Sequence, residues 1–231
     1  MSARFLDDEA RVAFKRAIEA IEAGSAVEVV VAVRRRSYHY RHVNTAIGIL
    51  VAFAGLAAML FASYTFALTS ILIDPFVVGL AAGALVELLP GVKRVLTPHA
   101  HRRMHVHRAA RATFVERGVH ATRERTGLLV YISWLEQEVA LIPDLGLARE
   151  LPPDDLARME KALTSEMKGG GARVAAALER IADEMRATMP VGEHDLNELS
   201  NSIDSDLARS RRLFRMGRRP PQGGGDGEST P

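Results

Sequence analysis

The chain has 231 residues, of which 48% are hydrophobic and 25% are charged, and its formal net charge at pH 7 is +2. This length allows one or two domains, and the modest net charge does not predict a nucleic-acid-binding face. The absence of cysteine excludes disulfides, thiol catalysis and Cys-ligated zinc or iron–sulfur sites, and it fits a reducing compartment.

The N-terminal segment, residues 6–23, predicts an amphipathic helix because Phe14, Ile18 and Ile21 recur at helical spacing. The next segment, residues 26–33, is a nearly continuous β-branched run, which is typical of a strand covered by helices. The first 24 residues are charged and lack the apolar core of a signal peptide. We therefore expect any membrane targeting to come from an internal segment.

Residues 43–92 predict a transmembrane helical hairpin, with helices over about 45–67 and 71–90. The stretch 43–73 carries no charge, and about 20 apolar residues suffice to cross a hydrocarbon core of about 30 Å. The second apolar run contains one charge, Glu87, near its end, where an acidic residue costs much less than at mid-membrane. The alternative is a pair of buried helices in a soluble domain.

Basic residues flank both ends of this hairpin, whereas residues 63–74 between its helices contain no Lys or Arg. This asymmetry predicts that both ends lie on the cytoplasmic side of the inner membrane, next to anionic headgroups. The basic residues expected at this interface are Arg34, Arg35, Arg36, Arg41, Lys93, Arg94, Arg102 and Arg103.

Small residues predict where the two hairpin helices touch. Gly79 and Gly83 form a GxxxG pair, and Gly48, Ala52 and Gly55 place small residues on one face of the first helix. Such faces allow close approach of helix backbones in lipid. We expect packing within the hairpin, and a homo-oligomer formed through the same faces is the alternative.

After the hairpin, residues 97–125 have helical character, and residues 127–134 and 138–143 predict two antiparallel strands joined by a tight turn. Helical spacing resumes at Pro153 and, after a break at 168–171, over residues 172–189. The segment 209–231, basic and then rich in Gly and Pro, predicts a disordered tail.

A single strand before the hairpin needs sheet neighbours, and the other predicted strands all follow the hairpin. The sequence therefore predicts one discontinuous α/β domain, residues 1–36 plus 97–208, built on a small mixed sheet. The hairpin would be inserted in a connection of this domain, which is possible because both of its ends lie on one side.

Three stretches of the chain resemble the TPM-domain family, which includes a thylakoid-lumen protein of photosystem II repair and many bacterial membrane proteins. They are AVEVVVAVRRRS, the long stretch ARATFVERGVHATRERTGLLVYISWLEQEVALIPDLGL, and the late NELSNSI. The resemblance implies an α/β/α sandwich, and it extends to a phosphatase activity and calcium binding attributed to some relatives. The matching positions are Glu28, Arg125, Thr126, Gly127, Glu136, Asp144 and Gly146, whereas Gln137, Asn201 and Ser202 depart from the family pattern.

Carboxylates near the strand ends are the candidate chemistry of this domain. Asp144 is the candidate catalytic residue, and Asp144, Glu136 and Asp154, with Asp155, could hold Ca²⁺ or Mg²⁺, which prefer oxygen ligands. The alternative assigns Asp144 to a turn and the other two aspartates to a helix start.

His101 and His105, four residues apart on a probable helix, could bind Zn²⁺ or Ni²⁺, with His99, His107, His39 and His42 nearby. The alternative is that these histidines are solvated or lie at the membrane interface. Two functions follow from the whole sequence. One is a non-enzymatic membrane module that binds a membrane protein in the assembly or maintenance of complexes, and the other is a membrane-bound, metal-assisted phosphatase.

Overall fold

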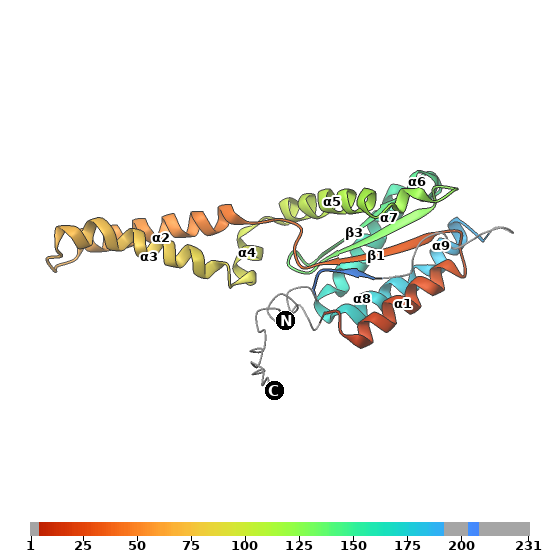
Figure 1. Cartoon of the computed structure of the whole chain (residues 1–231), viewed down its shortest axis with the longest axis horizontal. Helices are drawn as coiled ribbons and strands as arrows, with labels where there is room; N and C mark the ends of the chain where they lie inside the picture. The colour runs from red at the N-terminus through yellow and green to blue at the C-terminus, as the bar shows by residue number, and fades with distance from the viewer. Residues whose placement is uncertain (1–4, 192–202, 208–231) are drawn as a thin grey trace, which may run out of the picture.

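The computed structural model describes residues 5–191 and 203–207. It comprises a mixed α/β domain and a helical hairpin that projects from one end of that domain (Figure 1). The elements are, in chain order, α1 (Asp8–Glu22), β1 (Glu28–Arg34), α2 (Arg41–Phe61), α3 (Leu68–Val86), α4 (Pro90–Leu96), α5 (His99–Glu116), η2 (Val119–Ala121), β2 (Gly127–Ser133), β3 (Glu138–Pro143), α6 (Leu145–Glu150), α7 (Pro153–Glu166), η3 (Met167–Gly169), α8 (Gly171–Arg180), α9 (Ala182–Thr188) and β4 (Asp204–Ser205).

The sheet has four strands in the order β3-β2-β1-β4. β1 is parallel to β2, with Val31 opposite Val130, and β2 is antiparallel to β3, with Val130 opposite Leu141. The two-residue β4 lies parallel to the end of β1. The sheet is therefore mixed, and its central pair joins strands that precede and follow the hairpin.

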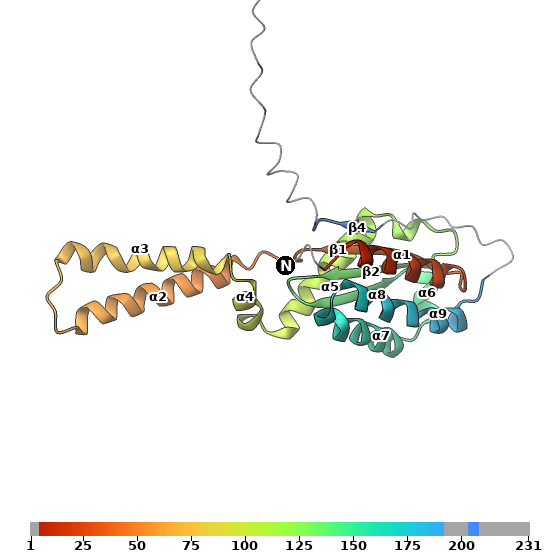
Figure 2. The ribbon, with the colours of Figure 1, turned by 90° about the horizontal axis from the view of Figure 1, so that it is seen from below.

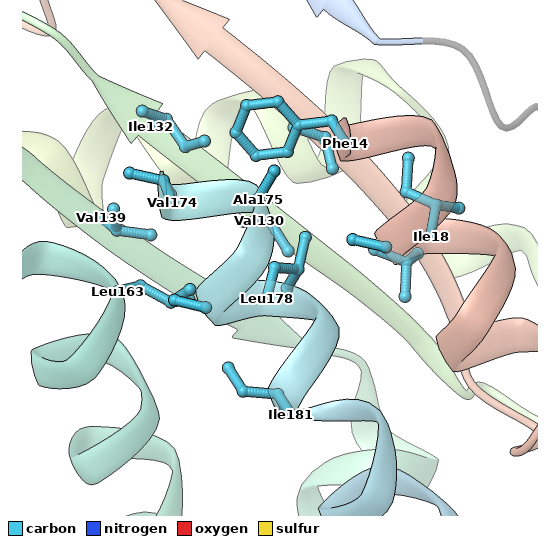
Figure 3. Packing of buried hydrophobic residues seen from close by; sticks show 14 of the residues in the cluster. Phe14, Ile18, Val130, Ile132, Val139, Leu163, Val174, Ala175, Leu178 and Ile181 are labelled. Carbon is cyan, nitrogen blue, oxygen red and sulfur yellow. The ribbon is translucent and has the colours of Figure 1, made fainter. Parts of the chain in front are cut away.

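Alternate residues of the buried strands serve two separate cores. Val29, Val31 and Val33 of β1 point to the face covered by α1, α7 and α8, where Phe14 and Leu178 are fully buried (Figure 3). The opposite face is covered by α5, whose Val106 packs with the other strand positions. Because both faces are covered, the strands are apolar throughout, as expected for a sheet between helices.

The hairpin helices α2 and α3 are long and apolar enough to cross a membrane. Little of either helix is buried inside the structure: 6% of the most apolar part of α2 and 17% of that of α3. The two helices lie side by side and extend away from the sheet (Figure 2). They are therefore not core helices of the α/β domain.

The helix bounds of the hairpin differ from the expected ones. The first helix ends at Phe61, and the second begins at Leu68 with Pro75 in its interior. The second ends at Val86, and a separate short helix, α4, starts at Pro90. Proline disfavours helical backbone at the residue before it, so Leu89 adopts a non-helical conformation and the helix stops early.

Three further segments differ from expectation. A six-residue helix, α6, follows Asp144 where no helix was predicted, and the helix expected over 172–189 is divided into α8 and α9 at Ile181. The strand β4 lies in a stretch where no strand was predicted. The predicted disordered tail, 209–231, and most of the late NELSNSI stretch lie outside the described residues. The prediction of an α/β fold with a small mixed sheet is confirmed.

Candidate functional site

The candidate site lies where the hairpin joins the sheet. The parallel strands β1 and β2 end at the same edge, the tight β2–β3 turn lies at this edge, and the segment after β1 crosses it on the way to α2. Backbone hydrogen bonds link the two segments, since Trp134 N and Leu135 N donate to the carbonyl oxygens of Arg34 and Arg35 at 2.9 and 3.0 Å. The turn and the root of the hairpin therefore form one unit.

A buried carboxylate, Glu136, is the centre of this unit. Its side chain is 1% exposed, and Oε1 accepts hydrogen bonds from Ser37 N at 3.1 Å and from Tyr40 Oη at 3.0 Å. Oε2 accepts from the hydroxyl of Ser133. Ser37 Oγ donates to Ser133 Oγ at 2.7 Å and lies 3.2 Å from the Tyr131 hydroxyl. A buried charge of this kind needs several donors to offset its desolvation.

Two tyrosines of this network are held in the protonated form. Burial, followed by the charge of Glu136, raises the pKa of Tyr40. Burial also raises the pKa of Tyr131, although its hydrogen bond with Ser37 acts in the opposite direction. Tyr40 immediately precedes α2, so its hydrogen bond to Glu136 joins the hairpin to the sheet domain.

A second carboxylate, Glu87, ties the end of α3 to its surroundings. Oε1 accepts from Arg36 Nη1 at 3.2 Å, and Oε2 accepts from Asn44 Nδ2 at 2.7 Å and from the ammonium of Lys93. The donors come from the segment after β1, from α2 and from α4. Glu87 therefore joins the three chain segments that meet at the root of the hairpin.

The basic residues expected at the membrane interface divide into two groups. Several are engaged inside the protein: Arg34 pairs with Asp204, Arg103 Nη2 lies 2.9 Å from Glu160 Oε2, and the 5% exposed side chain of Lys93 pairs with Glu87. Carboxylate partners therefore offset the charges of these three residues, and their position at a membrane interface stays a prediction.

Two more of these residues hold α4 in place, Arg94 by a contact with the β2–β3 turn and Arg102 by a contact from α5. Arg94 Nε donates to the Leu135 carbonyl at 3.1 Å, and Arg102 Nη1 donates to the Arg94 carbonyl at 2.8 Å. The remaining three, Arg35, Arg36 and Arg41, are exposed at the root of the hairpin. Their side chains reach solvent beside the hairpin, and Arg36 also pairs with Glu87 at 3.2 Å.

The histidines of α5 are distributed among different partners. His99 Nε2 lies 2.6 Å from Glu138 Oε1, and His107 Nε2 lies 3.5 Å from Glu160 Oε2. Burial of Glu138 raises the pKa of its carboxyl. For Glu160, burial is outweighed by hydrogen bonds from His107, the Leu141 amide and Arg103, which lower its pKa. These contacts fix α5 against β3 and α7.

The predicted histidine pair does not form a metal site with neighbouring ligands. His105 stacks on Tyr38, with ring centroids 3.9 Å apart, and its centroid is 6.5 Å from that of His101. Over residues 5–191 and 203–207, no group of three or more His, Cys, Asp or Glu side chains is arranged to hold a metal ion.

His105 gives a pH-dependent prediction. Burial and the neighbouring charge of Arg108, with smaller effects of His101 and His42, lower its pKa below 6.5, and Glu136 acts in the opposite direction. The unfolded chain therefore binds a proton before the folded one does, and stability is lost as pH falls below about 6.5. We expect His105→Gln to reduce the fall in unfolding free energy between about pH 7.5 and pH 5.5.

Urea titrations of the full chain at a series of pH values measure this slope. The control is His39→Gln, because His39 is an exposed histidine in the same region. If the unfolding free energy changes with pH equally in His105→Gln and in the unmodified chain, groups other than His105 cause the pH dependence.

The remaining candidate carboxylates lie at the far end of the sheet domain. Asp144 follows β3, whereas Glu136 precedes it, so a strand of six residues, about 20 Å long, separates them. Asp154 lies in the first turn of α7 with Asp155. Glu136 and Asp144 therefore do not share one cation, because the strand places them at opposite edges of the sheet. A cation site at Asp144 with Asp154 or Asp155 stays a prediction.

Asp144 is a helix cap in a tightly packed corner. It is 4% exposed, Oδ1 accepts from Leu145 N at 2.7 Å, and Oδ2 lies 3.4 Å from Arg125 Nε. Gly146 N also donates to the Arg125 carbonyl at 2.9 Å, and Arg125 has a positive φ of 60°. The RTG and Asp-x-Gly stretches therefore meet and stabilise each other's backbone.

The small residues of the hairpin lie at the contact between α2 and α3, where the sequence predicted them. A Cβ built on Gly79 would lie 2.5 Å from the Gly48 carbonyl oxygen, and a Cβ on Gly83 would lie 2.9 Å from the Asn44 carbonyl oxygen. At Gly55 the nearest atom, Cβ of Pro75, is 3.8 Å away. The helices are thus closest near the sheet domain and diverge toward their connection.

The donors of the Glu136 network were not predicted from the sequence. Ser37, Tyr40 and Ser133 carry no motif, and Ser37 and Glu136 are 99 residues apart in the chain. One sequence signal was available, because Glu136 in a two-strand turn beside apolar strands needs nearby donors if it is buried. The identity of those donors required the register of β1 and β2.

The fold defines the class of this protein as a mixed α/β domain with a four-stranded mixed sheet. No family model and no curated protein sequence matches the chain. Among solved structures, it is similar to the NMR structure of the BA42 protein from the psychrophilic bacterium Bizionia argentinensis, with a TM-score of 0.52 and 15% sequence identity over 87% of this chain and 95% of that chain. At this identity the similarity concerns the fold alone.

Proposed function

We propose that this protein is a membrane-anchored TPM-like domain, an α/β/α sandwich whose α2–α3 hairpin spans the inner membrane twice with both termini in the cytoplasm. In this proposal the domain is a non-enzymatic module that binds a membrane protein during the assembly or maintenance of membrane complexes. The hairpin supplies the anchor, and the exposed face of α5 supplies the binding surface.

The outward-facing apolar side chains of the hairpin carry the proposal. Phe53, Phe61 and Leu80 are 67%, 89% and 77% exposed, and they lie on helices that pack mainly against each other. Contact with the sheet domain is made at the root of the hairpin, where Val43 and Val86 pack with Leu135. Exposed apolar area of this kind is unfavourable in water at about 25 cal/mol per Å². A helix of 21 residues is about 30 Å long, which matches the hydrocarbon core of a bilayer.

The orientation follows from the root of the hairpin. Both helices connect to the same end of the sheet domain, and the exposed charges of Arg35, Arg36 and Arg41 lie there (Figure 1). The connection at residues 62–67 contains no Lys or Arg. A basic root and an uncharged tip favour a cytoplasmic position for the domain.

The outer face of α5 is the surface best suited to a protein partner. Met104 and Val115 are 46% and 64% exposed, and Arg108 and Arg111 lie between them without a carboxylate partner in the described part of the chain. α5 runs away from the hairpin, and Arg111 is twelve residues, about 18 Å, beyond the start of the helix. Headgroup charges are screened within about 8 Å, so an acidic and apolar protein segment fits this face better than lipid does.

Two measurements test the anchor. We expect the protein to remain in membranes after alkaline carbonate extraction, and we expect reporter insertions at residues 35 and 130 to report the same, cytoplasmic compartment. Extraction into the supernatant, or opposite compartments for the two reporters, would contradict the proposal.

Site-specific photo-crosslinking in membranes tests the interaction surface. A crosslinker at Arg108 is expected to trap a membrane protein, and Arg111→Glu is expected to reduce that product because it reverses a charge on the same face. The matched control is a crosslinker at Lys15, whose side chain is 66% exposed on α1. Equal products from both positions, or no effect of the charge reversal, would refute the assignment of this face.

The phosphatase alternative makes a separate prediction at Asp144. Because this residue caps α6, we expect Asp144→Ala to lower the free energy of unfolding by about 0.5 to 2 kcal/mol. We also expect the purified protein to hydrolyse a generic phosphomonoester no faster than Asp144→Ala does, with or without Ca²⁺ or Mg²⁺. Turnover that requires both the cation and Asp144 would replace the interaction module by the metal-assisted phosphatase.

A further inference from the structure

A polar cup lies at the root of the hairpin. It has a volume of about 230 Å³ and is lined by Arg36, His39, Tyr40, Arg41, Asn44 and Glu87. The negative charge of Glu87 is offset within the protein, because its carboxylate accepts hydrogen bonds from Arg36, Asn44 and Lys93. With Arg36, Arg41 and Lys93 around a single carboxylate, the charge at the cup is positive, which favours an anion.

An apolar groove of about 450 Å³ begins at this cup and runs along the hairpin. On α2 it extends from Asn44 and Thr45 to Phe53, and on α3 it extends from Ala84 to Phe76. Eight helical residues cover about 12 Å, which is close to the thickness of one leaflet of a hydrocarbon core of about 30 Å. The groove therefore has the length of an acyl chain within a single leaflet.

Asn44 lines both compartments and makes them continuous. Its Nδ2 donates to Glu87, whereas its Oδ1 is buried and has no hydrogen-bond donor among the described residues. Asn44 therefore joins the polar cup to the apolar groove, and a molecule with a polar head and an apolar chain can occupy both compartments at once.

We propose that the cup and the groove together bind one molecule of an anionic phospholipid, with its phosphate in the cup and one acyl chain in the groove. This proposal rests on the hairpin being embedded in a membrane. The cup is positive where the phosphate of an inner-leaflet lipid lies, and the groove is apolar where its chain lies. A second hairpin in the groove would cover the apolar part and leave the positive cup without an anion.

Native mass spectrometry of the full chain released from nanodiscs tests the site. With equal amounts of phosphatidylglycerol and phosphatidylcholine, we expect one retained phosphatidylglycerol per chain. Arg41→Gln removes a charge from the cup, and a juxtamembrane charge contributes about 1 kcal/mol, so occupancy should fall about fivefold. Ala84→Phe fills the groove and should reduce occupancy without changing the charge.

Each variant has a matched control. Arg149→Gln removes an exposed charge of α6, outside the cup, and Ala81→Phe adds the same ring to an exposed position of α3 that does not line the groove. Both controls should retain the lipid. Equal retention of the two phospholipids, equal losses in variants and controls, or a dimer without lipid would each overturn the proposal. A chain that does not enter nanodiscs would instead refute the membrane anchor on which the site rests.

Discussion

Replacing Glu136 with alanine is expected to lower the free energy of unfolding of the sheet domain by about 3 to 5 kcal/mol. The substitution removes the acceptor of the Ser37 amide, the Tyr40 hydroxyl and the Ser133 hydroxyl, and it leaves these donors buried. Tyr40→Phe removes one of the three hydrogen bonds and should cost about 1.5 to 3 kcal/mol. The fluorescence of Trp134, the single tryptophan, reports unfolding beside the site.

Glu116→Ala is the control for this prediction. Glu116 is an exposed carboxylate at the end of α5, so its removal should change stability by no more than about 0.5 kcal/mol. Urea unfolding of the full chain in micelles gives all three values. If Glu136→Ala lowers the free energy of unfolding by less than about 1 kcal/mol, the Ser37, Tyr40 and Ser133 donors find other hydrogen-bond acceptors.

Substitution of Gly146 by alanine is expected to destabilise the corner between β3 and α6 by about 1 to 3 kcal/mol. The added Cβ would lie 2.3 Å from the Glu124 carbonyl oxygen and 2.7 Å from that of Arg125. These atoms belong to the backbone, and the Arg125 carbonyl already accepts hydrogen bonds from Gly146 and Leu147. The corner cannot relax by turning a side chain away.

Gly91→Ala is the matched substitution, because a Cβ at Gly91 meets no atom within 4 Å. Alanine within α4 should leave stability unchanged or raise it by up to about 1 kcal/mol. Thermal unfolding followed by Trp134 fluorescence compares the two variants. Equal midpoints would mean that the corner around Gly146 is looser than the structure indicates.

The elements of the sheet could be read from the sequence because each strand is buried on both faces. Continuous apolar runs bounded by turn residues predicted strands at 26–33, 127–134 and 138–143, within two residues of the observed bounds. The short helix α6 could not be read in this way, because six residues are too few to show a helical period. β4 pairs through two residues, which is too short for any pattern.

The candidate site was predictable only in part. Glu136 and Asp144 both lie near strand ends, and this position suggested a shared cation, but the strand predicted between them already implied that they lie far apart. The partners of Glu136 depend on the pairing of β1 with β2, which no local pattern specifies. The prediction that Arg34 and Arg103 lie at the membrane rested on their charge alone. Their carboxylate partners, Asp204 and Glu160, are distant in the sequence and could not be recognised from it.

The pairing of β1 with β2 also sets an order of events during synthesis. Paired residues such as Val31 and Val130 are separated by the whole hairpin, and the ribosome adds about 5 to 20 residues per second. For about 5 to 20 s after β1 emerges, its central partner does not yet exist. The hairpin is completed in this interval, so both of its exposed apolar helices are synthesised before the sheet can close.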